Sequence, residues 1–211
     1  VVGVDALGYT SEMTENISIS TSDNLPPAIE ALDGTQHTYK QHEWAKLRFN
    51  ITDPENSIAD VTYENATDGD TFSKEDDLYY LVIDAKKIAP GSYSSRIVVT
   101  DDHGKTAECS VSFVIEPNTD PVLKSVMEDI ILSSDSAAKT VNLADHFTDA
   151  DGETLRYTAV SSDEEVLKVS VSKNNMTVTA SSYGMVTVTV TASDAMNRTV
   201  QASFKVLARD G

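Results

Sequence analysis

Apolar and polar residues alternate along most of the chain, and no segment of useful length shows the 3.6-residue period of an amphipathic helix. The clearest runs are residues 46–51, 107–115, 186–192 and 200–206. A period of two is typical of a strand with one buried face, and valine and threonine, which favour strands, dominate these runs. The pattern therefore predicts an all-β fold. It also predicts that Cys109, within the second run, points inward as a small buried hydrophobe.

The chain repeats one pattern twice, at a spacing of about 94 residues. The joint between the copies is residues 116–121, where two prolines bound a short linker. Each copy contains several short runs of alternation separated by turn residues, as an immunoglobulin-like sandwich requires. The matching landmarks are Asn24 with Asn118, Pro27 with Pro121, Asp53 with Asp149, Gly91 with Gly184, and Asp101 with Asp194.

We therefore predict two tandem immunoglobulin-like, cadherin-like β-sandwiches, over residues 23–117 and 118–211. Residues 1–22 are interpreted as the remnant of an upstream domain, which is either a hairpin or a tail. The hairpin is suggested because Asp5 and Gly8 stand like Asp101 and Gly104, where a loop needs positive φ. No secretory leader is recognised at Val1, so the chain is read as part of a longer protein.

Acidic residues outnumber basic ones, 34 to 16, which gives a net charge of −18. Such a charge argues against nucleic acid and anionic membranes as partners, since both are themselves negative. With one cysteine, the chain has no intramolecular disulfide. No apolar run is long enough to insert into a membrane.

The second repeat resembles a known family over residues 143–157 (LADHFTDADGETLRY) and 184–195 (GMVTVTVTASDA). The first is similar to the same group over residues 51–56 (ITDPEN) and 90–104 (PGSYSSRIVVTDDHG). The family is the dystroglycan-type cadherin-like modules of exported bacterial, Bacteroides-like, multidomain proteins. The resemblance implies an extracellular or cell-surface spacer or adhesion module without catalytic activity. Its expected partners are other domains of the parent protein and a protein or glycan at the cell surface.

The same resemblance implies a second role, as the accessory C-terminal region of a secreted enzyme. Such modules also follow catalytic domains, including those of subtilisin-like proteases, and residues 3–7 are loosely similar to the end of such a domain. A third alternative is a calcium- or carbohydrate-binding module. Sugar binding normally needs an aromatic platform, whereas Trp44 stands alone and only one of Tyr79 and Tyr80 can point outward.

Calcium at the joint is the sharpest chemical hypothesis, and no other cofactor is expected. In this topology the linker, the loop between the second and third strands, and the last hairpin loop meet at one end. Calcium takes about six to eight oxygen ligands. The alternative is a set of solvated Asx turns, and Lys86 and Lys87 stand where cadherins have further acids. The candidate ligands are Asn118, Asp120, Asp149, Asp151 and Asp194, with Asn24, Asp53, Glu55 and Asp101 as the equivalent set.

No catalytic residues are predicted. No serine stands in a Gly-x-Ser-x-Gly turn. His37 and His42 are five residues apart, which suits no zinc motif, and all four histidines are expected to be ordinary surface residues.

Overall fold

The computed structural model describes residues 2–12, 23–133 and 138–210. Within these residues the chain is almost entirely strands and connecting turns, with two short 3-10 segments, η1 (Ala85–Lys87) and η2 (Leu143–Asp145). The prediction of an all-β, immunoglobulin-like fold is confirmed. Neither helical segment approaches the length needed to cross a bilayer, and no other helix occurs in the described residues.

The first sandwich consists of two four-stranded sheets, ordered β3–β5–β8–β7 and β4–β10–β9–β6. All neighbours pair antiparallel except β4, which runs parallel to β10. The bounds are β3 (Ala28–Ala31), β4 (Gln36–Lys40), β5 (Trp44–Thr52), β6 (Ile58–Glu64), β7 (Asp70–Glu75), β8 (Leu78–Asp84), β9 (Gly91–Asp101) and β10 (Thr106–Glu116).

Alternate residues of these strands form the core of the first sandwich, as their period predicts. Phe49, Leu81, Ile97 and Phe113 are buried together. Cys109 is partly buried and packs against this core, which confirms its inward orientation. Burial of the Cys109 thiol raises its pKa, so it is less readily ionised than an exposed thiol.

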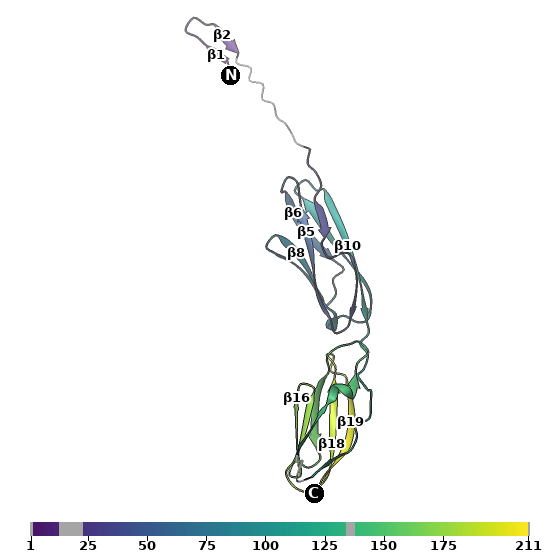
Figure 1. Cartoon of the computed structure of the whole chain (residues 1–211). Coiled ribbons are helices and arrows are strands. Elements are labelled where there is room, and N and C mark those ends of the chain that lie inside the picture. The colour runs from purple at the N-terminus through teal and green to yellow at the C-terminus, as the bar shows by residue number, and fades with distance from the viewer. Residues whose placement is uncertain (1, 13–22, 134–137, 211) are drawn as a thin grey trace.

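The second sandwich repeats this arrangement with shorter, more interrupted strands, and Figure 1 shows it beyond the end of β10. Its sheets are ordered β12–β19–β18–β15 and β13–β17–β16, with β11 paired to β14. The bounds are β11 (Val122–Leu123), β12 (Ile130–Leu132), β13 (Ala138–Asn142), β14 (Phe147–Thr148), β15 (Arg156–Ser161), β16 (Leu167–Ser172), β17 (Asn175–Ala180), β18 (Gly184–Ser193) and β19 (Thr199–Ala208).

A separate cluster of buried residues forms the second core, around Leu143, Leu167, Met176, Val188 and Phe204. None of its members belongs to the cluster in the first sandwich. The domain boundaries at residues 23, 117 and 118 stay a prediction, since separate clusters do not by themselves establish units that fold alone.

Three features of the strands do not follow from the alternating runs. Residues 122–132 form two separate strands, because β11 pairs with β14 and β12 crosses to β19. β4 was missed because it is a polar edge strand that pairs only with β10. β7 was missed because it is largely polar and pairs only with β8.

β1 (Val2–Val4) and β2 (Thr10–Glu12) form a hairpin, as the sequence suggested. Asp5 Oδ1 accepts hydrogen bonds from the amides of Leu7 and Tyr9, at 2.9 and 3.0 Å. Gly8 has φ +85°, and the equivalent Gly104 and Asn197 have φ +81° and +63°. Asparagine and glycine are the residues that adopt this conformation at least cost. The rest of the predicted remnant, residue 1 and residues 13–22, lies outside the described residues.

Candidate functional site at the joint of the two sandwiches

The chain leaves β10 and enters the second sandwich through Asn118, whose side chain is held at the start of the β18–β19 hairpin. Asn118 Nδ2 donates to Asp194 Oδ2 at 2.7 Å and to the Thr119 carbonyl at 2.7 Å. The other Asp194 oxygen, Oδ1, accepts from the Arg198 amide at 2.7 Å. Asn118 is 4% exposed and Asp194 is fully buried. The linker is therefore fixed to the hairpin by a buried charge-assisted hydrogen bond.

Asp149 and Asp151 lie in the turn after β14 and hold the next part of the linker. Asp149 Oδ1 accepts from the Asp151 amide at 2.7 Å. Asp151 Oδ2 in turn accepts from the Thr119 amide at 2.7 Å and from its hydroxyl at 3.0 Å. The hydrogen bond from the Thr119 amide, followed by that from its hydroxyl and by the Lys40 ammonium, outweighs burial and holds the pKa of Asp151 below its usual range.

Asp120 lies at the solvent-exposed edge of this cluster, with its side chain 68% exposed, and pairs with Arg198 at 2.8 Å. Arg198 Nη1 also donates to the Asn118 carbonyl at 3.0 Å. We name the group Asn118, Asp149, Asp151, Asp194 and Arg198 the entry face of the second sandwich.

Two ammonium groups of the first sandwich reach this end of the second sandwich. Lys40, at the end of β4, places Nζ 3.3 Å from Asp151 Oδ1 and 2.8 Å from Glu116 Oε2. Lys86 Nζ donates to the Ala195 carbonyl at 3.5 Å. The ammonium closest to the carboxylates is therefore that of Lys40, which stands on the strand that the sequence did not reveal.

His42 corrects the expectation that every histidine is an ordinary surface residue. Its side chain is only 16% exposed, and Nδ1 lies 3.1 Å from Oε2 of Glu153, whose side chain is 5% exposed. The angle is not that of a hydrogen bond, but the distance allows an ion pair when the imidazole is protonated. Glu153 was not a predicted site residue. Its place two positions after Asp151 was the one signal that could have found it.

The first sandwich carries an equivalent entry face, formed by Asn24, Asp53, Glu55, Asp101 and Lys105. Asn24 Nδ2 donates to Asp101 Oδ2 at 2.7 Å, and Asp101 Oδ1 accepts from the Lys105 amide at 2.8 Å. Burial would raise the pKa of Asp101, but these bonds and one from the His103 amide outweigh it and lower that pKa. The two faces thus share one hydrogen-bonding scheme.

The predicted calcium ligands are brought together only in part. Asp149 and Asp194 lie in one group with Glu153, with one oxygen from each within 4.8 Å of the others. Asp120 and Asp151 instead meet Arg198 and Lys40. Among the described residues, Asp149 Oδ2 and Asn118 Oδ1 are buried without a hydrogen-bond partner. Such oxygens are of the type that calcium binds, although a buried water meets the same need.

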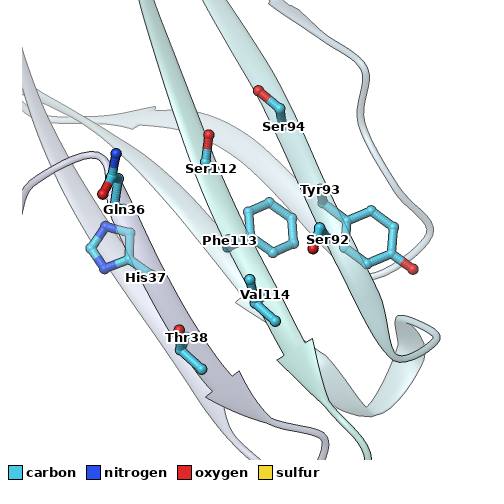
Figure 2. Close-up of a pocket in the computed structure, with 9 residues that line it drawn as sticks. All are labelled: Gln36, His37, Thr38, Ser92, Tyr93, Ser94, Ser112, Phe113 and Val114. Atoms are coloured by element: carbon cyan, nitrogen blue, oxygen red, sulfur yellow. The ribbon is translucent and has the colours of Figure 1, made fainter.

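The outer face of β4, β10 and β9 carries a shallow hollow of about 670 Å³, shown in Figure 2. Its lining combines hydroxyl-bearing side chains with larger ones, and the ring of Phe113 turns into the core rather than into the hollow. The lining residues besides Phe113 are Gln36, His37, Thr38, Ser92, Tyr93, Ser94, Ser112 and Val114. Elsewhere Lys46 covers one face of Tyr80, with Nζ 4.0 Å from the ring centroid, and Trp44 is 61% exposed. The hollow itself therefore offers hydroxyl groups rather than an aromatic platform.

Comparison with solved structures gives likenesses of low identity. An endo-fucoidan hydrolase of glycoside hydrolase family 107 is 15% identical, with TM-score 0.41, over 98% of this chain and 33% of that one. Titin domains z1z2 in complex with telethonin are 11% identical, with TM-score 0.36, over 87% and 97%. The sialic acid binding region of a Streptococcus sanguinis SK1 adhesin is 12% identical, with TM-score 0.37, over 90% and 79%.

The chain thus spans a third of the length of the two fucoidan hydrolase chains that it matches first. No curated protein matches it. Residues 118–207, which cover nearly all of the second sandwich, match the family model described as a bacterial Ig domain. The second sandwich is therefore similar to a bacterial Ig domain, and a sandwich of the same all-β, immunoglobulin-like fold precedes it.

Proposed function

We propose that this chain is a non-catalytic spacer of a larger exported surface protein, which holds two immunoglobulin-like sandwiches at one fixed orientation. The observation that carries the proposal is the pair of contacts from the first sandwich to the second, namely the Lys40–Asp151 ion pair and the hydrogen bond from Lys86 to the Ala195 carbonyl. A chain joined only by a polar linker would let its modules reorient freely.

The linker itself supports a fixed orientation because it has little freedom. Asn118 and Thr119 are each bound to a different loop of the second sandwich, through Asp194 and Asp151. The Asn118 amide also lies 3.4 Å from the Gln41 side-chain oxygen of the first sandwich. Proline at positions 117 and 121 further restricts the backbone on both sides.

The test is the distribution of distances between the two sandwiches. Spin labels are placed on cysteines introduced at the exposed positions Thr62 and Lys168, in a Cys109→Ser background, and measured by pulsed electron paramagnetic resonance. A narrow distribution is expected. Lys40→Ala should broaden it, because the contact with Asp151 is lost.

The matched control is Lys87→Ala, because Lys87 is 67% exposed and pairs with Asp84 inside the first sandwich. It should leave the distribution unchanged. A broad distribution in the unsubstituted protein contradicts the proposed function directly.

A second candidate function is calcium binding at the same joint, and the buried unpartnered oxygens of Asn118 and Asp149 favour it. The ion would lie among Asp149, Glu153 and Asp194, where the negative charge is concentrated. His42 opposes it, because a protonated imidazole 3.1 Å from Glu153 competes for the same carboxylate.

Calorimetric titration with calcium chloride at pH 7.5 tests this candidate. Heat of binding and a melting temperature that falls on chelation are expected, and both should be lost in Asp149→Asn. Asp120→Asn is the matched control, since Asp120 lies outside the cluster. Absence of heat in the unsubstituted protein removes calcium from the joint.

A further inference from the structure

We propose that the entry face of the first sandwich is a docking surface for the lysine-bearing end of another immunoglobulin-like sandwich. The partner is identified by its chemistry, namely ammonium groups placed like those of Lys40 and Lys86. The inference extends the proposed function, because it takes the joint between the two sandwiches as the example of a docked face.

The two entry faces are built by the same hydrogen bonds. Beyond the Asn24–Asp101 bond, the Glu55 amide donates to Asp53 Oδ1 at 3.0 Å, as the Asp151 amide donates to Asp149. The Leu25 amide donates to Glu55 Oε2 at 3.3 Å, as the Thr119 amide donates to Asp151. Lys105 Nζ donates to the Asn24 carbonyl, as Arg198 does to that of Asn118. The first face is therefore already formed in the geometry that receives a partner.

The two faces differ in whether another sandwich lies against them. Lys40 lies on the second face, and the Asp151 side chain is 2% exposed. Glu55, the equivalent residue of the first face, is exposed, and the side chain of neighbouring Asp102 is 57% exposed. Asp53 Oδ2 is buried without a hydrogen-bond partner, as is Asp149 Oδ2. This unpartnered oxygen therefore occurs in both faces and does not depend on a neighbouring sandwich.

The charge of the open face selects a basic partner. Its carboxylates are those of Asp53, Glu55, Asp101 and Asp102, while the ammonium of Lys105 is held at the Asn24 carbonyl. Asp102 occupies the place of Ala195, whose carbonyl receives Lys86 in the covered joint. An approaching lysine would thus meet the Asp102 carboxylate, which already contacts His103 Nδ1, and the exposed carboxylate of Glu55. Ser57 replaces Glu153, so a histidine like His42 is not required of the partner.

The opposite end of the second sandwich does not provide such a partner. By the register of its parallel pair, in which Leu132 faces Ala208, Ser133 stands where the first sandwich has Lys40. The connection between β17 and β18 reads Ser181, Ser182 and Tyr183, without the lysines of η1. A second copy of this chain should therefore not dock end to end. The partner must carry lysines at the end opposite its own entry face, where the first sandwich has Lys40 and Lys86.

The direct experiment duplicates the first sandwich within the full chain. Residues 24–117 are inserted after Asp23, so that the new junction joins Pro117 to Asn24 just as the native joint joins Pro117 to Asn118. Spin labels across the new joint and, in a second sample, across the native joint are measured by pulsed electron paramagnetic resonance. Both distributions should be equally narrow. Glu55→Lys with Asp102→Lys on the second copy should broaden the new joint alone.

A broad new joint beside a narrow native joint overturns this inference and leaves the proposed function standing, whereas two broad joints overturn both. A second variant avoids the added sandwich altogether. Asp151→Glu, Glu153→Ser, Ala195→Asp and Arg198→Lys give the second face the charged side chains of the first. If the first face can dock, the native distribution stays narrow, and a distribution as broad as that of Lys40→Ala overturns the inference.

Discussion

Replacing Asn118 with alanine tests the buried bond on which the entry of the chain into the second sandwich depends. The substitution removes two hydrogen bonds of 2.7 Å, one of them to the carboxylate of Asp194. It leaves Asp194 Oδ2 without its donor in a fully buried position. A hydrogen bond to a charged group contributes about 1.5–3 kcal/mol, and a buried acceptor left unpaired costs about 1–3 kcal/mol. Because these terms overlap, we expect a loss of about 2–4 kcal/mol in the second sandwich.

Hydrogen exchange followed by mass spectrometry measures this loss locally, which matters because two sandwiches need not unfold in one step. Peptides from β18 and β19 should lose protection by the factor that corresponds to the lost free energy. Peptides from β9 and β10 should be unchanged, because their core cluster is separate.

Asn24→Ala is the matched control, since Asn24 makes the same bond to Asp101 at 2.7 Å but is only partly buried. Its effect should fall on β9 and β10 and be smaller, about 1–2 kcal/mol. Unchanged exchange in the second sandwich of Asn118→Ala, or an equal loss in both sandwiches, would refute the reasoning.

Three further outcomes follow from the structure. Phe113→Ala should destabilise the first sandwich by about 3–5 kcal/mol, because Phe113 is 1% exposed. Hydrogen exchange in the second sandwich should not change, and an equal loss of protection there would contradict two separate cores. Gly69→Ala should also destabilise the first sandwich, because a Cβ would lie 2.4 Å from Ile88 Cγ1 and 2.6 Å from the Asp84 carbonyl; a melting temperature equal to that of the unsubstituted protein would contradict this. The pKa of Asp151 is lowered in the folded state, so its ionised carboxylate stabilises the fold above the ordinary pKa of about 4, and this stabilisation is lost as the pH falls through the lowered pKa. The melting temperature of Asp151→Asn should therefore depend less on pH in acid than that of the unsubstituted protein. An unchanged pH profile would exclude that contribution.

Alternation of side chains was sufficient to predict the fold class and much of the core. Residues such as Phe49 and Val188 face inward because a strand turns every second residue to the same side, which is a local property of the backbone. The repeat of Asn24 as Asn118 and of Asp101 as Asp194 likewise placed the same turn chemistry at the entrance to each sandwich.

The strands that alternation did not reveal are those whose position depends on a distant partner. β4 is polar and exists because β10 offers it a free edge. The segment before β12 breaks because β11 and β12 pair with different strands, β14 and β19, which local sequence does not encode. These pairings join residues far apart in the chain, so only the folded sheet selects them.

The sequence by itself therefore determined that this protein is an all-β chain with one tandem repeat and with acidic loops at the start of each copy. Only the tertiary structure decided which charges meet at the joint. It places Lys40 rather than Lys86 against Asp151, and it buries His42 beside Glu153. Strand alternation is set by neighbouring residues, whereas these contacts form between side chains more than 100 residues apart, and their distances are fixed only when both sandwiches are folded and joined.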